Sequence, residues 1–314
     1  MLIGCTVTPP ENKQSRAVET VFAPYQVEQL HQHLASLSAD NMAGRRFASP
    51  ESIKAQEYLI ASLAQSDVKP WQQQFIHPFT HSTFFTKKLG KNIIGYVQGT
   101  SFPDRYILLS AHYDHLGKKG TNIYNGADDN ASGTAALLVF AEKIAKAPLK
   151  HSVIFLFTDA EEVNLLGAKA FINEQQQLLP QIKLNINIDM IAGSKKTKRL
   201  YYIDNRLGQV LSPNKIQQLY RLPHSQNIKL KRGFKNKNIS TNNRISWTRA
   251  SDHGAFNRAK IPFIYFGVGT HKNYHTTHDD FANVNLGFYL QACQSIFAHL
   301  RFFDDHIGIN TNKT

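Results

Sequence analysis

Imidazole and carboxylate side chains recur in short clusters along this chain, and most clusters directly follow a run of apolar residues. Carboxylates gathered in one place repel one another and destabilise a fold unless a cation neutralises them. Histidine, aspartate and glutamate without a thiolate form a ligand set suited to hydrolytic zinc. We therefore expect a metal site if the fold brings these clusters together. The clusters are His112–His115, Gly126–Gly133, Asp159–Glu162, Asp189 and Tyr274–Asp280.

Each cluster taken alone has an ordinary structural explanation. A His-x-Asp at a strand end and a Glu-Glu pair on a surface are both common, and Asp-Asp-Asn favours a helix N-terminus. A single histidine such as His275 is more often structural than a metal ligand. Several such pieces in succession, each just beyond a predicted buried strand, make coincidence a poor explanation, so we favour the metal site.

The elements that position these clusters are predicted strands alternating with predicted helices. This alternation predicts an α/β fold with a mostly parallel central sheet and helices on both faces. In such sheets the ligand site lies beyond the carboxyl ends of the strands, where the clusters stand. The expected strands are Asn92–Val97, Tyr106–Ala111, Ser152–Thr158, Lys183–Ile188 and Ile261–Val268, and the expected helices are 25–37, 51–65, 134–146, 165–177 and 286–303.

The composition is that of a globular chain with enough apolar residues for one large core. Of 314 residues, 42% are hydrophobic and 19% are charged, and no run approaches the roughly 20 apolar residues of a membrane span. The formal charge of +13 is spread along the chain, so we interpret it as a basic surface and expect no nucleic-acid partner. The densest basic runs, Lys195–Arg199 and Lys229–Lys237, are predicted to lie in loops.

Residues 1–24 are polar, and we predict that they form a leader or linker before a single domain at 25–314. The segment Leu2-Ile3-Gly4-Cys5 resembles the lipobox of bacterial lipoproteins, although only four residues precede Cys5 and the usual apolar core is missing. We favour a truncated signal and a lipid tether at Cys5, in the bacterial cell envelope or periplasm, with secretion as the alternative. Cys293 is predicted to be a small buried hydrophobe.

Taken together, the motifs resemble those of the zinc peptidases of peptidase family 28, typified by bacterial leucyl aminopeptidase and also containing animal glutaminyl cyclase. The resemblance extends from Leu37 to about Leu300 and includes the segment Leu37–Arg45, which is similar to a loop at the mouth of the family's site. It implies a zinc exopeptidase fold of the phosphorylase/hydrolase-like type. It also implies an aminopeptidase that acts on peptides with a free N-terminus.

The same resemblance implies roles for individual residues. Asp129 would bridge two zinc ions, and the Asp129–Asn130 peptide bond would be cis. Asp114 would hydrogen-bond the far nitrogen of His112, and Glu161 would be the general base that takes a proton from a metal-activated water. The implied metal ligands are His112, Asp129, Glu162, Asp189 and His275.

One segment departs from the family pattern. Some aminopeptidases of the family have a tyrosine just before the Ser-Asp-His segment, where it supports the oxyanion, whereas this chain has Trp247–Ala250 before Ser251–His253. Tyr265 and Tyr274 are the two candidate donors, and the sequence does not rank them. Two further histidines beside the motifs are interpreted as supporting or structural residues rather than ligands: His115 and His278.

Three alternatives to an aminopeptidase stay open. A glutaminyl cyclase on the same scaffold would close an N-terminal glutamine ring without an attacking water, but the animal enzymes differ at Asp128–Ala131. A carboxypeptidase would need a basic pocket for the substrate carboxylate, supplied by Arg244 or Arg249. A non-catalytic binding module is disfavoured by Glu161, because a protein that only binds has no need of a base beside the ligands.

Overall fold

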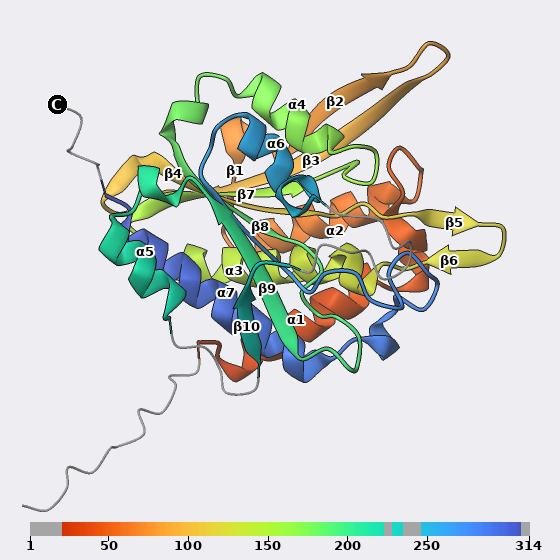
Figure 1. The fold of residues 1–314 in the computed structure, drawn as a ribbon. Coiled ribbons are helices and arrows are strands. Elements are labelled where there is room, and N and C mark those ends of the chain that lie inside the picture. The colour runs from red at the N-terminus through yellow and green to blue at the C-terminus, as the bar shows by residue number, and fades with distance from the viewer. Residues whose placement is uncertain (1–20, 223–227, 235–245, 309–314) are drawn as a thin grey trace, which may run out of the picture.

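The computed structural model describes residues 21–222, 228–234 and 246–308, through which one large sheet runs (Figure 1). Within these residues nine strands follow the order β1-β3-β7-β4-β8-β11-β9-β10, with β2 also paired to β3. Most of the predicted leader, including Cys5, lies outside the described residues. The strands are β1 Lys69–Pro70, β2 Ile76–Ser82, β3 Lys87–Val97, β4 Phe102–His112, β7 His151–Thr158, β8 Ile182–Ile188, β9 Arg199–Asn205, β10 Lys229–Arg232 and β11 Phe263–Gly267.

The centre of this sheet is parallel and its flanks contain antiparallel pairs. Strand β4 pairs in parallel with both β7 and β8, and β8 pairs in parallel with β11. On one flank β3 runs antiparallel to β7, and on the other β9 runs antiparallel to β11. The five strands expected from the sequence are β3, β4, β7, β8 and β11, so the predicted α/β sheet with a mostly parallel centre is confirmed.

Helices cover both faces of the sheet, as the sequence of β7 requires. Val153, Phe155 and Phe157 belong to a core shared with α1, α2, α3 and α7, whereas Ile154 and Leu156 pack with α4 and α6. Every residue of β7 is buried, which is why its central run Val153–Phe157 is continuously apolar. The helices are α1 Pro24–Leu37, α2 Ser52–Gln65, α3 Gly133–Lys146, α4 Leu166–Glu174, α5 Pro213–Tyr220, α6 His253–Arg258 and α7 Leu286–His306.

The chain packs onto this core slightly before its first helix. Phe22 is buried, and its ring centroid lies 6.0 Å from that of Phe140 and 5.9 Å from that of Phe297. The last residues of the predicted leader therefore contribute to the core. Among the described residues, no helix combines the length and the apolar character that a bilayer span requires.

Both basic runs expected in loops extend into strands, β9 and the edge strand β10. Strand β10 pairs in parallel with β9, with Lys229 opposite Arg199 and Leu230 opposite Leu200. The loop prediction is therefore wrong for Lys229–Arg232 and for Arg199. The side chains of the edge strand β10 are mostly exposed, so it can carry lysine and arginine at positions where a buried central strand must be apolar.

Two hairpins extend from the same side of the molecule (Figure 1). One is formed by β2 and β3, and the other by β5 (Gly117–Lys119) and β6 (Asn122–Tyr124). Neither β2 nor the small hairpin is expected from the sequence, because β2 contains Pro78 and the other two strands are only three residues long. Both hairpins border the larger of the two cavities described below.

Candidate metal centre

The polar clusters meet at the carboxyl ends of three neighbouring strands. Strand β4 ends at His112, which lies opposite Thr158, the last residue of β7. Strand β8, on the other side of β4, ends just before Asp189. Because parallel strands present their carboxyl ends at one edge, residues far apart in the sequence become neighbours.

The first group of possible ligands surrounds the Nε2 atom of His112. This nitrogen lies 3.4 Å from Asp129 Oδ1 and 3.3 Å from Asp189 Oδ1. All three side chains are buried, and their ligand atoms lie within 4.8 Å of one another. One imidazole and two carboxylates at this spacing can hold one divalent cation.

The second group surrounds the other oxygen of Asp129. His275 Nε2 lies 3.1 Å from Asp129 Oδ2 and 3.3 Å from Glu162 Oε1. His115 Nδ1 lies 3.0 Å from the same Glu162 oxygen. Asp129 thus offers one carboxylate oxygen to each group, and the structure brings all five sequence-predicted ligands together. It also brings in His115, which the sequence did not single out as a ligand.

The residues present fit a pair of divalent cations. Glu162 Oε1 and both ring nitrogens of His115 are buried and make no hydrogen bond of good geometry among the described residues, although Nδ1 lies 3.0 Å from that oxygen as an ion-pair contact. A cation between them would supply the missing interaction. Burial alone would lower the pKa of His275, but Asp129 and Glu162 raise it to about 10. Burial and Asp129 oppose ionisation of Glu162, yet the neighbouring imidazoles hold its pKa at about 2. Such carboxylates favour a positive partner, and the nitrogen and oxygen donor set suits zinc.

Asp114 holds the turn that carries two of the acidic side chains. Its carboxylate accepts hydrogen bonds from the backbone N–H groups of Glu161, at 3.0 Å, and Glu162, at 3.4 Å. The expected contact with His112 Nδ1 is 3.6 Å long, beyond hydrogen-bond distance, while the Asp114 carbonyl oxygen lies 3.1 Å from that nitrogen. The carboxylate of Asp114 therefore mainly joins the end of β4 to the turn after β7.

The turn that presents Asp129 is fixed from two directions. The Asp279 carboxylate accepts hydrogen bonds from the backbone N–H groups of Asp128, at 2.9 Å, and Asp129, at 3.0 Å. The Asn130 side chain donates to the carbonyl oxygen of Ile188, the last residue of β8, at 2.9 Å. The Asp129–Asn130 peptide bond is cis, as the family resemblance implies. Sequence reasoning did not identify Asp279, whose position just after His-Thr-Thr-His gives no sign of this contact.

Arg45 is a second supporting residue whose role the sequence did not show. Its guanidinium is buried and donates hydrogen bonds of 2.5–3.0 Å to four backbone carbonyls from three separate segments. Five N–H donors in a planar fork make arginine suited to such a junction. The acceptors are the carbonyl oxygens of Leu37, Tyr113, Asn125 and Gly126.

A small pocket of about 220 Å³ adjoins the metal centre on one side. Trp247, Tyr265 and Tyr274 line it together with the Glu161 side chain. Burial raises the pKa of Tyr265 and of Tyr274 well above the usual range, so both hydroxyls stay protonated and able to donate. Burial and neighbouring carboxylates also raise the pKa of Glu161, which His112 opposes. This pocket offers an aromatic wall, hydroxyl donors and a carboxylate.

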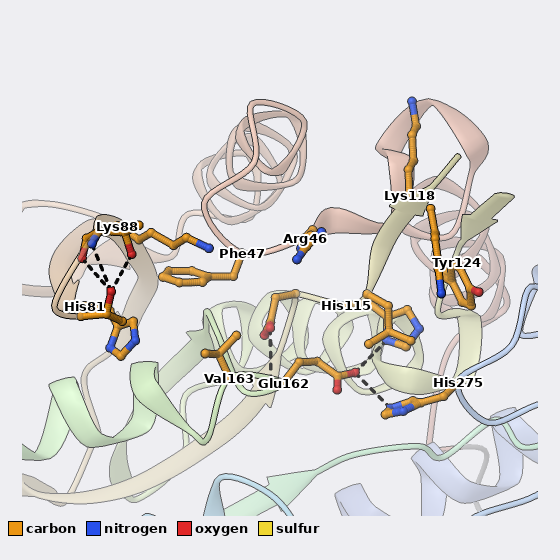
Figure 2. A pocket seen from close by; sticks show the side chains of 15 residues that line it. Arg46, Phe47, His81, Lys88, His115, Lys118, Tyr124, Glu162, Val163 and His275 are labelled. Atoms are coloured by element: carbon orange, nitrogen blue, oxygen red, sulfur yellow. Dashed lines mark hydrogen bonds and ion pairs between the residues drawn. The ribbon is translucent and has the colours of Figure 1, made fainter. Parts of the chain in front are cut away.

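A larger cavity of about 770 Å³ opens on the other side of the centre (Figure 2). It extends from His115, Glu162 and His275 to the two projecting hairpins. Its rim carries four cationic side chains, which have no ion-pair partner among the described residues. They are Arg46, Lys88, Lys118 and Lys119.

The chain resembles known proteins both in sequence and in fold. A profile of the family described as peptidase family M28 matches residues 92–300. Aminopeptidase YwaD of Bacillus subtilis (strain 168) is 26% identical over 210 residues, covering 64% of this chain and 42% of that protein. A glutaminyl cyclase from Fimbriiglobus ruber has a TM-score of 0.68 at 16% identity, covering 89% of this chain and 96% of that one. BSAP, a zinc aminopeptidase from Bacillus subtilis, has a TM-score of 0.65 at 17% identity, covering 88% and 95%.

These matches differ in what they support. The two solved structures share the fold of this chain over nearly their whole length. The chain spans less than half the length of the curated relatives that it matches. The profile match includes the carboxyl ends of β4, β7 and β8, together with His275.

Proposed function

The chain belongs to peptidase family M28, and on that basis we propose that it is a two-zinc aminopeptidase that removes N-terminal residues from peptides. The observation that carries this proposal is the position of Asp129, whose Oδ1 faces His112 and whose Oδ2 faces His275. A carboxylate placed in this way is suited to bridge two cations. Two-metal sites of this kind promote attack by water on a carbonyl.

Each cation would have its own set of protein ligands. His112 and Asp189 would complete one set with Asp129, and Glu162 and His275 would complete the other. When bound, the pair would polarise the scissile carbonyl and lower the pKa of a shared water. Both sets lie against the small pocket, so a substrate carbonyl in that pocket would be within reach of both.

The protein's own side chains would supply the proton transfers. Glu161 lines the small pocket beside the ligands but is not part of either group, so its carboxylate is free to accept the proton of the attacking water. It would then pass this proton to the leaving amine. The hydroxyl of Tyr265 or Tyr274 would donate a hydrogen bond to the oxyanion.

The difference between the two cavities accounts for cleavage from the end of a peptide. A volume of about 220 Å³ suits one side chain, whereas the 770 Å³ cavity can receive several residues. The first residue would occupy the small pocket, with its α-amine beside Asp189 and Glu161, and the rest of the peptide would lie in the larger cavity. No lysine or arginine lines the small pocket among the described residues, which favours an amine over a carboxylate there. This arrangement supports an aminopeptidase over the carboxypeptidase alternative.

Four substrates, each assayed with and without 1,10-phenanthroline, test the proposal. We expect cleavage of leucine p-nitroanilide and of a Leu-initiated peptide, loss of both with the chelator, and recovery when zinc is added. Conversion of a Gln-initiated peptide to its cyclic form, without hydrolysis of the other substrates, would instead identify a glutaminyl cyclase. Release of C-terminal residues from an N-acetylated peptide would identify a carboxypeptidase. Inactivity in all assays of the zinc-loaded protein would support a binding module.

A further inference from the structure

We infer that His115 is an additional metal ligand, which binds the cation on the Glu162 side together with His275. The inference rests on the metal centre proposed above and goes beyond the five side chains that the family resemblance implies. It would give the two cations unequal surroundings, with two imidazoles on the Glu162 side and one on the Asp189 side.

The distances around Glu162 support a common point of coordination. His115 Nδ1 lies 3.0 Å from Glu162 Oε1 and 3.7 Å from Asp129 Oδ2, and the corresponding distances from His275 Nε2 are 3.3 and 3.1 Å. Ligand atoms of a tetrahedral zinc with bonds of about 2.1 Å are separated by about 3.4 Å. The four measured distances lie on either side of that value.

The orientation of the two imidazole rings agrees with this arrangement. Two imidazoles bound to one zinc place their ring centroids about 5–6 Å apart, because each centroid lies about 3.2 Å from the ion. The centroids of His115 and His275 are 5.7 Å apart, with the rings edge to face. Figure 2 shows the two rings on either side of the Glu162 carboxylate, each with a nitrogen toward it.

The burial of His115 without a hydrogen bond is unusual in this protein. Its ring is 1% exposed, and neither nitrogen makes a hydrogen bond of good geometry among the described residues, since Nδ1 meets Glu162 Oε1 at 3.0 Å only as an ion-pair contact. The other buried histidines of the described residues each use at least one ring nitrogen in a hydrogen bond, and they are His77, His112, His151, His253 and His299. A buried imidazole without such a partner is expected where the partner is a bound ion.

The backbone holds the His115 ring in place before any ion binds. A Cβ atom at Gly126 would lie 2.5 Å from Cγ of His115, so the ring packs directly on a residue without a side chain. The backbone N–H of His115 donates to the carbonyl oxygen of Arg45 at 3.3 Å. These contacts keep the ring beside the carboxylates, which reduces the entropy lost on coordination.

The charge of the centre favours a neutral extra ligand. Four carboxylates line it, from Asp129, Glu161, Glu162 and Asp189. Their formal charge balances two divalent cations, so a further carboxylate would leave an excess of negative charge in a buried site. A neutral imidazole adds a donor without disturbing that balance.

Nuclear magnetic resonance of the wild-type protein tests the assignment directly. The protein is labelled with ¹⁵N at histidine, stripped of metal and loaded with ¹¹³Cd²⁺, a spectroscopic substitute for zinc. We expect one-bond cadmium couplings to three imidazole nitrogens. Couplings to only two would overturn the inference and leave the proposed function intact, whereas an absence of cadmium binding would overturn both.

Two substitutions separate coordination from a supporting hydrogen bond. We expect His115→Leu to weaken binding of one zinc ion by more than about 100-fold, above the range typical when a supporting hydrogen bond is lost. His115→Asn retains an amide that can donate to Glu162 but lacks the imidazole, so it should show a similar loss. Wild-type affinity in His115→Asn would contradict the inference. His278→Gln, at an exposed histidine beside the same motif, is the control and should bind both ions normally.

Discussion

Two cavities meet at Glu162 and His275, and they differ in size and in chemistry. The smaller has an aromatic wall that includes Trp247 and contains the acidic side of the metal centre. The larger is more than three times its volume and has a cationic rim built from separate hairpins and a loop. The difference indicates that the small pocket selects one residue and orients it, whereas the large cavity accepts a chain with little dependence on its sequence.

The origin of the two cavities in the fold explains the contrast. The small pocket is built from strand ends and from segments stacked against them, such as Tyr265 in β11, whose ring stacks on His253 with centroids 4.3 Å apart. The rim of the large cavity is built from exposed side chains on hairpins, such as Lys88 and Lys118. Residues held by the core can define a shape, while exposed cationic side chains mainly supply charge.

The largest expected effect comes from the carboxylate in the small pocket. We expect Glu161→Gln to lower kcat by about 100- to 10,000-fold, because the amide cannot accept the proton of the attacking water. Zinc content, measured by mass spectrometry, should stay at the wild-type level. A variant that keeps most of its activity would show that another residue is the general base. The small pocket would then no longer differ from the large cavity in supplying that base.

The second prediction concerns Asp189, an expected metal ligand that lines the small pocket and not the larger cavity. We expect Asp189→Ala to weaken one zinc ion by more than about 100-fold, since a direct ligand should count for more than a supporting residue. The thermal midpoint of the zinc-loaded variant should fall, because bound metal stabilises the folded state by about 4 kcal/mol at 1,000 times its dissociation constant. His81→Gln, at the far wall of the large cavity, is the control. Unchanged zinc stoichiometry in Asp189→Ala would exclude it as a ligand.

The third prediction tests selection by the aromatic wall. The Trp247 ring stacks on Phe234 with centroids 4.2 Å apart, and Phe234 stacks in turn on Tyr265. We expect Trp247→Ala to lower kcat/KM for leucine p-nitroanilide about 10-fold more than for alanine p-nitroanilide, because the larger side chain loses more apolar contact. Phe84→Ala, at an exposed hairpin residue, should change neither. Equal losses for both substrates would mean that the small pocket does not select the first residue.

The smallest effect is expected at the cationic rim. Charges on exposed side chains contribute about 0.2–1 kcal/mol each, so the double variant Lys118→Glu/Lys119→Glu should lower kcat/KM several-fold for a peptide with acidic residues after its first leucine. The loss should shrink as salt is added. Leucine p-nitroanilide, which is too short to reach the rim, should be hydrolysed as before.

A matched pair of substitutions on another part of the surface completes that experiment. Lys183 stands at the start of β8 and Lys260 just before β11, at the edge of the sheet opposite the carboxyl ends that form the site. The double variant Lys183→Glu/Lys260→Glu makes the same change in net charge and should leave all the substrates unaffected. If both double variants slow the acidic peptide equally, the rim has no specific role and the total charge of the protein is responsible.

Much of the fold follows from the sequence because the central strands are buried on both faces. The apolar run in β7 has no stable position except inside a sheet, and its neighbour β4 contains a similar run. The other central strand, β8, alternates isoleucine and leucine with polar residues. The edge strands carry much weaker patterns. β10 reads Lys-Leu-Lys-Arg and, among the described residues, pairs with the single neighbour β9, so its hydrogen bonds rather than its side chains define it as a strand.

The residues of the candidate site likewise divide into those whose positions could be expected from the sequence and those placed only by the tertiary structure. His112 and Asp189 directly follow apolar strands, so their positions at the sheet edge could be expected from the sequence. His115 lies in the same tetrapeptide as His112, but its place beside Glu162 depends on the contact of its ring with Gly126 and of its backbone with Arg45. These contacts join segments that have no common sequence pattern.

The sequence by itself determined the α/β sheet, the family and the polar residues that follow the strands. The reason is that burial of strands requires runs of apolar residues, which can be recognised in the linear sequence. Only the tertiary structure decided which side chains face the same carboxylate oxygen and how the two cavities divide around it. Those features depend on distances between segments up to 160 residues apart, such as His115 and His275. Packing of the whole chain sets such distances, and no local propensity encodes them.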